Sequence, residues 1–292
     1  MSPQYIWYNG ELRPFETGQS PALAHGLHYG TGVFEGIRAY DATHGPAVFR
    51  LDAHLKRMKY GAELLGMPFS IEEMKAAIFQ TLEANQHRAA YIRPLAFYAA
   101  GGLGLDVLPL KAHYMVATLP WTSHLGDAAD DTGVRVMRSP FQRVSAKAIP
   151  TAKLCGVYVN SVIAKKHSTE NGFDEALFVD DKGWVCECTG ENVFAVFGSE
   201  VVAVQHPDAL NGITRATVMD MLGAKQRPVS YEELLTADEV FLTGTSAEIA
   251  GVSALDQRVY GKGKLTQELK AWYQDTVHGR ESGRESWLSW AA

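Results

Sequence analysis

The hydrophobic pattern near the N-terminus predicts a hairpin followed by a helix. Residues 5–15, YIWYNGELRPF, carry apolar and aromatic residues on both sides of Asn9-Gly10, the strongest short signal for a hairpin turn. Residues 47–66 change from a strand pattern to a helix pattern, and Asp52 is the expected N-cap. One face of this helix is expected to carry Leu55, Met58, Ala62 and Leu65.

A second helix and two strands follow. Ser70 and Glu73 have the spacing of a capping box, so we expect a helix from there to about Asn85. Its inward positions are Ile71, Met74, Ile78 and Leu82. Residues 91–98 and 113–121 have strand patterns and flank a glycine-rich loop, AAGGLGLD.

The pattern changes after residue 118. Residues 119–131, LPWTSHLGDAADD, are small, acidic and turn-forming, which is typical of an interdomain linker. Strand patterns then dominate, at residues 134–139, 175–180, 184–190, 192–197, 201–204 and 239–244. Helices are expected after Lys153, around residues 218–222, from a capping box at Ser230 to Glu233, and from about Thr266. We therefore predict an α/β (α+β) protein with a small α/β domain over residues 1–118 and a larger, strand-rich domain over residues 132–292.

Composition places the chain among ordinary globular proteins. Its 292 residues favour two domains, and 46% hydrophobic and 21% charged residues are normal values. The net charge of −6 argues against a nucleic-acid partner. No apolar run approaches about 18 residues, and the start, MSPQYIWYNGEL, lacks the basic and apolar regions of a signal peptide. We expect a cytoplasmic protein with no membrane partner.

The cysteines and histidines do not predict a disulfide framework or a metal site. The three cysteines are an odd number. Cys186 and Cys188 form a C-x-C pair, but zinc needs about four ligands in a recognisable spacing, and apart from Cys155 the other candidates are scattered histidines. His25 and His28 are expected to be structural, beside a turn.

Lys153 is the centre of the chemical interpretation. It lies in IPTAKLCGVYVNS, residues 149–161, among small and apolar neighbours, and no acidic residue occurs between Asp131 and Glu170. Seven basic residues fall in that interval. Such surroundings push an amine toward its neutral form, which attacks carbonyl carbon and forms Schiff bases. The alternative is a lysine on a half-exposed strand whose stem covers apolar surface.

A Schiff-base lysine suggests pyridoxal 5'-phosphate, which needs an acid at its pyridine nitrogen and a donor at its phenolic oxygen. Glu187 fits the acid, because it lies in a strand between two cysteines that are expected to point to the opposite face. Tyr158, five residues after Lys153, fits the donor if the backbone turns at Gly156. An exposed glutamate on an edge strand and a core tyrosine would have the same signature.

Two further segments fit a phosphate cradle. NGITR, residues 211–215, places a glycine, free amides and a threonine hydroxyl at the start of a helix, where the macrodipole favours an anion. GTS, residues 244–246, ends a strand in the same manner, and Arg57 could add positive charge. Each turn alone would also be explained as an ordinary helix cap.

Seven motifs occur in order over nearly the whole chain. They are YGTGVFEGIR at 29–38, YIRP at 91–94, LPW at 119–121, IPTAK followed by GxY at 149–158, ECTGENVF at 187–194, GITR at 212–215 and GTSAEI at 244–249. In combination they resemble the branched-chain amino acid aminotransferases, which are fold type IV pyridoxal phosphate enzymes. The resemblance implies a larger domain of pseudo-barrel form, pyridoxal 5'-phosphate as cofactor, and transamination of leucine, isoleucine or valine with 2-oxoglutarate.

The resemblance also implies roles for matching residues. Lys153 matches the Schiff-base lysine that moves the proton at the substrate α-carbon, Glu187 the carboxylate at the pyridine nitrogen, and Tyr158 the hydroxyl near the phenolic oxygen. The phosphate cup is matched by Arg57, Ile213, Thr214 and Thr245. The substrate pocket is matched by Phe34, Gly36, Tyr91, Trp121 and Ala247, and the arginines near the substrate by Arg38 and Arg93.

Such an enzyme must accept both an apolar side chain and the γ-carboxylate of 2-oxoglutarate. Arg93 lies two residues after Tyr91 on one predicted strand, so both side chains should point to the same face. We expect Arg93 to bind the γ-carboxylate, with Arg38 as the second candidate.

The resemblance further implies a homodimer or a higher homo-oligomer with shared active sites. Tyr29 and the loop with Leu103 and Leu105 would reach the partner's site. The donor stays open, because D-amino acid aminotransferases and R-selective amine transaminases share the fold. A non-enzyme alternative is a module that binds a phosphorylated metabolite through NGITR and GTS. The run VFEGIR and the pair Glu191-Asn192 favour the branched-chain group.

Overall fold

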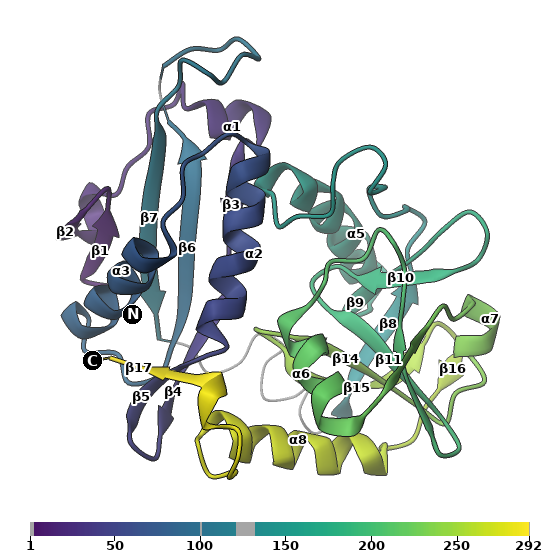
Figure 1. Cartoon of the computed structure of the whole chain (residues 1–292). Coiled ribbons are helices and arrows are strands. Elements are labelled where there is room, and N and C mark those ends of the chain that lie inside the picture. The colour runs from purple at the N-terminus through teal and green to yellow at the C-terminus, as the bar shows by residue number, and fades with distance from the viewer. Residues whose placement is uncertain (1–2, 100, 121–131, 292) are drawn as a thin grey trace. The chain divides into compact units, whose positions relative to one another are not determined.

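The computed structural model describes residues 3–99, 101–120 and 132–291, which form two compact units (Figure 1). Unit 1 comprises residues 1–121, 152–157 and 275–292, and unit 2 comprises residues 122–151 and 158–274. The expected linker lies almost entirely outside the described residues.

The division differs from the expected domains in two segments, 152–157 and 275–292, which belong to unit 1. Both are attached by backbone pairing. Leu154 bridges to Val33, and β17 (Leu288–Trp290) pairs with β5 (Gly45–Phe49). The pattern of hydrophobic residues does not reveal such pairings, because the partners lie more than 100 residues apart in the chain.

Unit 1 is built on an eight-stranded sheet of order β17-β5-β4-β6-β7-β1-β2, in which β3 also pairs with β6. Its other strands are β1 (Tyr5–Tyr8), β2 (Glu11–Pro14), β3 (Gly32–Phe34), β4 (Ile37–Ala42), β6 (Ala90–Tyr98) and β7 (Ala112–Leu119). The predicted hairpin is confirmed. β1 and β2 are antiparallel, and Asn9 and Gly10 between them have φ of 49° and 96°, the positive values that a tight hairpin turn needs.

Two long helices of unit 1, α2 (Leu51–Leu64) and α3 (Ile71–Ala84), pack on each other, and α3 lies against β1, β6 and β7 (Figure 1). The prediction for α3 is confirmed: Ser70 Oγ accepts from the amide of Glu73 at 3.1 Å, and Asn85 is the C-cap. Shorter helical segments are η1 (Phe15–Thr17), α1 (His25–Tyr29), η2 (Cys155–Val157) and η3 (Glu285–Trp287).

The predicted N-cap of α2 is wrong. Asp52 lies within the first turn, and the N-cap is Arg50 with φ of 52°. Because β5 ends at Phe49, the chain turns into the helix through one left-handed residue, whose amide donates to the Trp287 carbonyl at 2.7 Å. Leu55, Met58 and Ala62 are buried as expected, whereas Leu65 is only half-buried.

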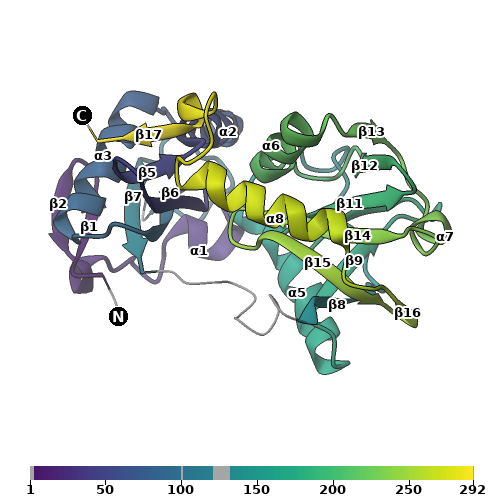
Figure 2. The same ribbon diagram turned by 90° about the horizontal axis from the view of Figure 1, so that it is seen from below.

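Unit 2 contains a nine-stranded sheet that curls into a half-barrel, of order β10-β9-β8-β15-β14-β11-β12-β13, with β16 paired to β15 (Figure 2). The pairs β8–β9, β8–β15 and β12–β13 are parallel. The strands are β8 (Val134–Arg138), β9 (Glu175–Val179), β10 (Val185–Cys188), β11 (Asn192–Phe197), β12 (Glu200–Val204), β13 (Lys225–Arg227), β14 (Glu239–Gly244), β15 (Glu248–Leu255) and β16 (Arg258–Val259).

The helices of unit 2 include α5 (Tyr158–Glu170), α6 (Ile213–Leu222) and α7 (Tyr231–Leu234), and α8 (Lys264–Val277) begins there. α5 packs on β9, and α6 packs on β12 and β14 (Figure 2). A second predicted cap is confirmed, since Ser230 Oγ accepts from the amide of Glu233 at 3.1 Å. Within the described ranges, no helix is both long and apolar enough to cross a membrane.

Candidate active site

Lys153 is held in unit 1 by strand β3. The amide of Phe34 donates to the Lys153 carbonyl at 3.2 Å, and the next residue, Leu154, bridges to Val33. The side-chain nitrogen Nζ of Lys153 lies 5.0 Å from the centre of the Phe34 ring. The predicted catalytic amine therefore lies over the aromatic face of a predicted substrate-pocket residue.

Close contact between two glycines fixes the same segment. The amide of Gly156 donates to the Gly30 carbonyl at 3.1 Å. Gly30 has φ of 65°, and a Cβ there would lie 2.5 Å from Gly156 Cα. A side chain at Gly30 would separate the two backbones, so this position needs glycine to keep the lysine segment on unit 1.

Strand β6 presents Tyr91 and Arg93 on one face, as their spacing predicts. Arg93 Nη2 donates to the Tyr91 hydroxyl at 2.7 Å, and Arg93 Cζ lies 4.8 Å from the centre of the Phe34 ring. Arg93 Nε is buried and has no hydrogen-bond partner among the described residues. Gly36 is needed here, because a Cβ would collide with the Tyr91 hydroxyl. Unit 1 thus brings Phe34, Gly36, Tyr91, Arg93 and Lys153 together.

Arg38 lies on β4 directly opposite Tyr91 on β6, and it is 7% exposed. Its Cζ is 4.9 Å from the centre of the Tyr40 ring. Arg38 therefore borders the same cluster from the neighbouring strand. Trp121 lies outside the described residues.

The loop between β6 and β7 is attached to α1. The Tyr29 hydroxyl donates to the Leu103 carbonyl at 2.7 Å, and His25 Nε2 donates to the Gly104 carbonyl at 2.9 Å. His25 Nδ1 also lies 2.7 Å from Thr31 Oγ1. These bonds agree with the structural role expected of His25. Leu105, on the same loop, is 81% exposed.

Arg57, on α2, is bound by a carboxylate that the sequence analysis did not single out. Glu35, between Phe34 and Gly36, accepts hydrogen bonds from Arg57 Nε at 2.6 Å and from Arg57 Nη2 at 2.9 Å. Burial alone would raise the pKa of Glu35, but the charge of Arg57 and the hydrogen bonds from Arg57 and His54 outweigh it and hold that pKa well below its usual range. Glu35 is therefore an ionised, fully buried carboxylate.

In unit 2, Glu187 is buried and accepts hydrogen bonds from its neighbours. Its Oε1 accepts from Arg143 Nε at 2.7 Å, and its Oε2 accepts from the amide of Leu210 at 2.9 Å and from Asn192 Nδ2 at 3.3 Å. Arg143 and Glu187 side chains are each 7% exposed. These bonds stabilise a charged carboxylate, the form that a pyridinium nitrogen requires.

The expected alternation around Glu187 is wrong. Val185 pairs with Val179 and Cys188 with Leu177, so β10 has one residue more than β9 over this interval, which is a β-bulge. Cys188 consequently packs in the main core of unit 2, while Cys186 packs in a separate cluster beneath α5. Burial raises the pKa of both thiols, so they are inert core residues. The direction of the Glu187 side chain is therefore set by the bulge and not by strict alternation along the strand.

The N-terminus of α6 fits an anion. Gly212 is its N-cap, and no side chain among the described residues caps it. A Cβ at Gly212 would collide with Asn192 Oδ1, so the position excludes a side chain. Ile213 and Thr214 are buried in the first turn, where amides lack acceptors within the helix. Thr245 and Ala247 lie half-buried in the turn between β14 and β15.

Unit 2 also contains a pair of buried carboxylates, Glu175 and Glu191, whose proximity the sequence analysis did not predict. Glu175 accepts from Lys165 Nζ at 2.8 Å and from Thr189 Oγ1 at 2.5 Å. Burial, followed by the charge of Glu175, raises the pKa of the neighbouring Glu191 to about 8. Glu191 is therefore protonated at neutral pH.

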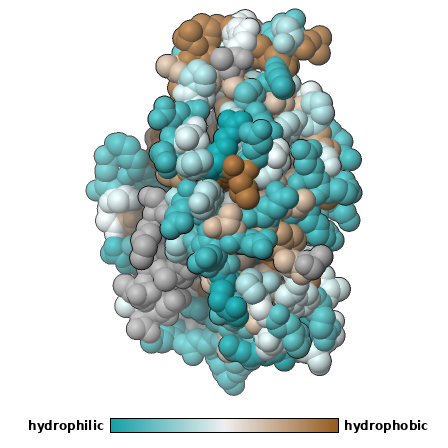
Figure 3. All heavy atoms as spheres, turned by 90° about the vertical axis from the view of Figure 1, so that its left-hand side faces the viewer, coloured by the Kyte–Doolittle hydropathy of each residue, from teal (hydrophilic) through white to brown (hydrophobic). Residues whose placement is uncertain are grey.

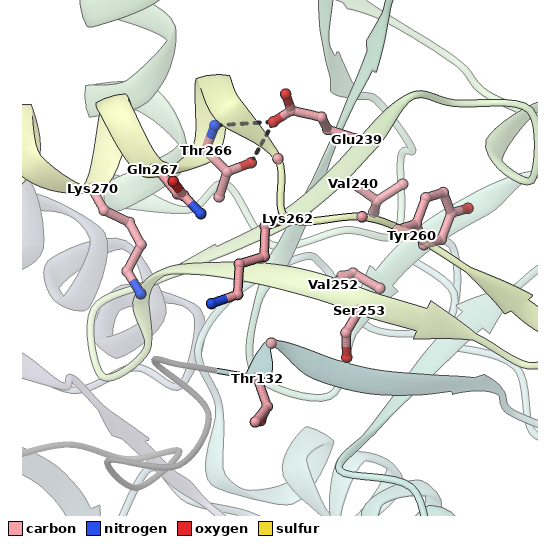
Figure 4. Close-up of a pocket in the computed structure, with 14 residues that line it drawn as sticks. Thr132, Glu239, Val240, Val252, Ser253, Tyr260, Lys262, Thr266, Gln267 and Lys270 are labelled. Carbon is pink, nitrogen blue, oxygen red and sulfur yellow. Dashed lines mark hydrogen bonds between the residues drawn. The ribbon is translucent and has the colours of Figure 1, made fainter.

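Unit 2 contains two cavities, of which the smaller lies apart from the predicted catalytic groups of that unit and the larger is lined in part by Leu210, Asn211 and Arg215, at the predicted phosphate cradle. One, of about 100 Å³, is lined by residues around the start of α8, including Lys262 and Lys270 (Figure 4). Glu239 already caps the helix there, since its carboxylate accepts from the amides of Leu265 and Thr266 at 3.1 and 3.0 Å. The other, of about 430 Å³, is lined by residues including His206 and Arg215. Arg215 is engaged with the Val204 carbonyl and Gln226.

Comparison with known proteins places the chain in a class. The family model of class IV aminotransferases matches residues 32–255. The chain therefore belongs to the class IV aminotransferases, as the resemblance of its motifs predicted. These enzymes are pyridoxal 5'-phosphate-dependent, and the donor groups described above fit that cofactor.

Within this class, the chain is similar to branched-chain-amino-acid aminotransferases. It is 37% identical to that of Pseudomonas aeruginosa, over 97% of this chain and 95% of that protein, and 34% identical to that of Escherichia coli (strain K12), over 97% and 96%. The structure of the T.th. branched-chain amino acid aminotransferase with pyridoxamine 5'-phosphate has a TM-score of 0.94 and 41% identity, covering 99% of each chain. The structure of the same enzyme complexed with N-(5'-phosphopyridoxyl)-L-glutamate has a TM-score of 0.93 and 40% identity, also covering 99% of each chain.

Proposed function

We propose that this aminotransferase moves the amino group of leucine, isoleucine or valine to 2-oxoglutarate, with pyridoxal 5'-phosphate as cofactor. The observation that carries the proposal is the cluster in unit 1 that combines an aromatic surface with a positive charge, in which Arg93 lies 4.8 Å from the Phe34 ring and 2.7 Å from the Tyr91 hydroxyl. The branched-chain names of the relatives and the phosphopyridoxyl-glutamate complex of the T.th. enzyme support it. Because the chain belongs to an enzyme family, we discard the alternative of a non-enzyme module that binds a phosphorylated metabolite.

The cofactor, when bound, supplies an electron-withdrawing ring that stabilises negative charge at the substrate α-carbon. Lys153 is proposed to hold its aldehyde carbon and to carry the proton that leaves and returns at the α-carbon. Glu187, fixed by Arg143 and the Leu210 amide, keeps the pyridine nitrogen protonated, and Tyr158, the first residue of α5, donates to the phenolic oxygen. The phosphate is assigned to Arg57, to the amides of Ile213 and Thr214, and to Thr245.

The two substrates make opposite demands on the pocket. Leucine needs an apolar surface, which Phe34, Tyr91, Trp121, Ala247 and the backbone at Gly36 are proposed to supply. Burying the γ-carboxylate of 2-oxoglutarate without a cation would cost on the order of several kcal/mol. Arg93 can present its planar guanidinium to that carboxylate while its stem leaves the apolar surface free, and Arg38 is the second candidate.

We further propose a cytoplasmic homodimer or higher homo-oligomer with shared active sites. Large apolar residues are exposed on α1 and on the β6–β7 loop, with Leu27, Leu105 and Leu108 exposed by 72%, 81% and 89%. Figure 3 shows hydrophobic side chains gathered at the end of unit 1 where Figure 1 places these segments. Exposed apolar patches of this kind mark interaction surfaces. Tyr29, Leu103 and Leu105 are assigned to the partner's active site.

A donor screen tests the proposal. The purified protein with added pyridoxal 5'-phosphate is given L-leucine, L-isoleucine, L-valine, D-alanine or an R-amine, with 2-oxoglutarate as acceptor. We expect glutamate to form with the three L-amino acids and at most traces with the other donors. Preference for D-alanine or the R-amine would replace the branched-chain assignment with one of the two same-fold alternatives.

A further inference from the structure

Glu35 has no role in the proposed chemistry, yet it lies at the centre of the residues that carry it. It is 0% exposed, and its neighbours in the chain are Phe34 and Gly36, both assigned to the substrate pocket. Its amide donates to the Pro94 carbonyl at 3.0 Å, which fixes the backbone. The Phe34 amide donates to the Lys153 carbonyl at 3.2 Å. One tripeptide, Phe34-Glu35-Gly36, thus touches the catalytic lysine through its backbone and Arg57 through its side chain.

The carboxylate binds one edge of the Arg57 guanidinium. Oε1 accepts from Nε at 2.6 Å, and Oε2 accepts from Nη2 at 2.9 Å. Two parallel bonds to a planar fork fix both the position and the plane of the guanidinium. The N–H donors on the opposite edge, including those of Nη1, must then point away from Glu35, because the fork is rigid.

His54 completes the arrangement from the same helix as Arg57. Its Nδ1 lies 2.8 Å from Glu35 Oε2, and the residue is 1% exposed. Burial lowers the pKa of His54, so the imidazole is neutral at neutral pH. An ionised carboxylate can only accept, so Nδ1 carries the hydrogen and donates it to Oε2. Glu35 is therefore held from two directions, by residues three positions apart on α2.

A buried ion pair of this kind is poor evidence of a contribution to stability alone. Taking both charges out of water costs more than a pair of apolar side chains would, unless hydrogen bonds satisfy the remaining atoms. Here those bonds satisfy the carboxylate and orient Arg57. The cost is explained if the orientation of the arginine is the useful result, since a preoriented side chain loses less rotamer freedom when its ligand binds.

We propose that Glu35 is a positioning residue that holds Arg57 as a preoriented fork for the phosphate of the cofactor. The inference rests on the proposed function, in which Arg57 binds that phosphate. Glu35 itself does not contact the cofactor. Its effect on binding is therefore specific to ligands that carry a phosphomonoester, the group that Arg57 binds.

The apoenzyme tests this through two cofactor forms, pyridoxal 5'-phosphate and pyridoxal, which lacks the phosphate. Dissociation constants of both are measured by absorbance for the wild type, for Glu35→Gln and for Glu175→Gln. Glu175 is a matched control, because it is a buried carboxylate 2.8 Å from Lys165 and outside the proposed site. The quantity compared is the preference ratio, the Kd of pyridoxal divided by the Kd of pyridoxal 5'-phosphate.

We expect Glu35→Gln to lower the preference ratio by about tenfold, which corresponds to the free-energy cost of ordering one arginine side chain. The Kd of pyridoxal itself should change by less than about twofold. Glu175→Gln should leave the ratio unchanged. If Glu35→Gln weakens both ligands equally, Glu35 only supports the fold and the inference is overturned. If the wild type does not prefer the phosphorylated form, the assignment of Arg57, and with it the proposed function, fails instead.

A second variant covers the case in which Glu35→Gln does not fold. Arg57→Lys keeps a positive charge beside Glu35 but replaces the rigid fork with a flexible point charge. If fixed orientation matters, this variant also lowers the preference ratio, although the local charge is unchanged. An unchanged ratio would show that charge alone is sufficient, which would overturn the positioning role.

Discussion

Replacing Arg93 with alanine tests how one pocket accepts both an apolar side chain and a carboxylate. In the structure Arg93 Nη2 donates to the Tyr91 hydroxyl at 2.7 Å, while Nε is buried without a hydrogen bond among the described residues. A hydrogen bond to a charged group contributes about 1.5–3 kcal/mol. At about 1.4 kcal/mol for each factor of ten, Arg93→Ala should raise the KM for 2-oxoglutarate and glutamate roughly 10- to 150-fold.

The KM for leucine should change much less, because its side chain needs only the apolar surface. Tyr91→Phe removes the hydroxyl that holds Arg93. Because a hydrogen bond to such a neutral group contributes about 0.5–1.5 kcal/mol, we expect the KM for 2-oxoglutarate to rise roughly 2- to 10-fold. Arg88→Ala is the control, since Arg88 is an exposed arginine of unit 1 bound to Asp41.

Steady-state kinetics with each substrate varied at saturating partner gives these values. Equal rises for leucine and 2-oxoglutarate in Arg93→Ala would refute the reasoning, because Arg93 would then support the fold or a carboxylate site common to both substrates. A selective effect in Arg38→Ala with none in Arg93→Ala would transfer the role to the second candidate.

Three further predictions follow from single contacts. Gly36→Ala forces a Cβ against the Tyr91 hydroxyl and should lower the free energy of unfolding by about 1–3 kcal/mol, whereas Gly261→Ala, with nothing within 4 Å, should change it by less than about 0.5 kcal/mol in denaturant titrations. Glu187→Gln should keep the cofactor but lose most of the half-reaction rate with leucine, and an unchanged rate would exclude its assigned role. Because the pKa of Glu191 is raised to about 8 from 4.5, its contribution to stability is complete below about pH 4.5 and is lost as the pH rises to about 8. Glu191→Gln should therefore flatten the fall in unfolding free energy over that interval, and an equal fall in both proteins would contradict the raised pKa.

Local rules predicted the elements that local chemistry controls. The Asn9-Gly10 hairpin and the capped starts of α3 and α7 depend on residues within four positions of one another. The pairing of β17 with β5 was not predicted, because its partners are about 240 residues apart and β17 has only three residues. The attachment of residues 152–157 to β3 has the same cause.

The sequence indicated candidate reacting groups, but it did not indicate the residues that hold them in place. Tyr91 and Arg93 share a face because strand periodicity is local. Glu187, in contrast, is directed by a bulge that depends on the register between β9 and β10. Glu35 carried a signal that could have been used, since it is a lone carboxylate within the apolar run GVFEGI, where a charge requires a buried partner.

The central claim is that Lys153 is the amine that holds the cofactor. Its most direct test is borohydride reduction of the protein saturated with pyridoxal 5'-phosphate, followed by peptide mapping by mass spectrometry. We predict that the phosphopyridoxyl group is found on Lys153, and that Lys153→Ala is unlabelled and inactive but keeps a cooperative thermal unfolding transition. A label on another lysine with Lys153 unmodified, or normal turnover by Lys153→Ala, would contradict the account.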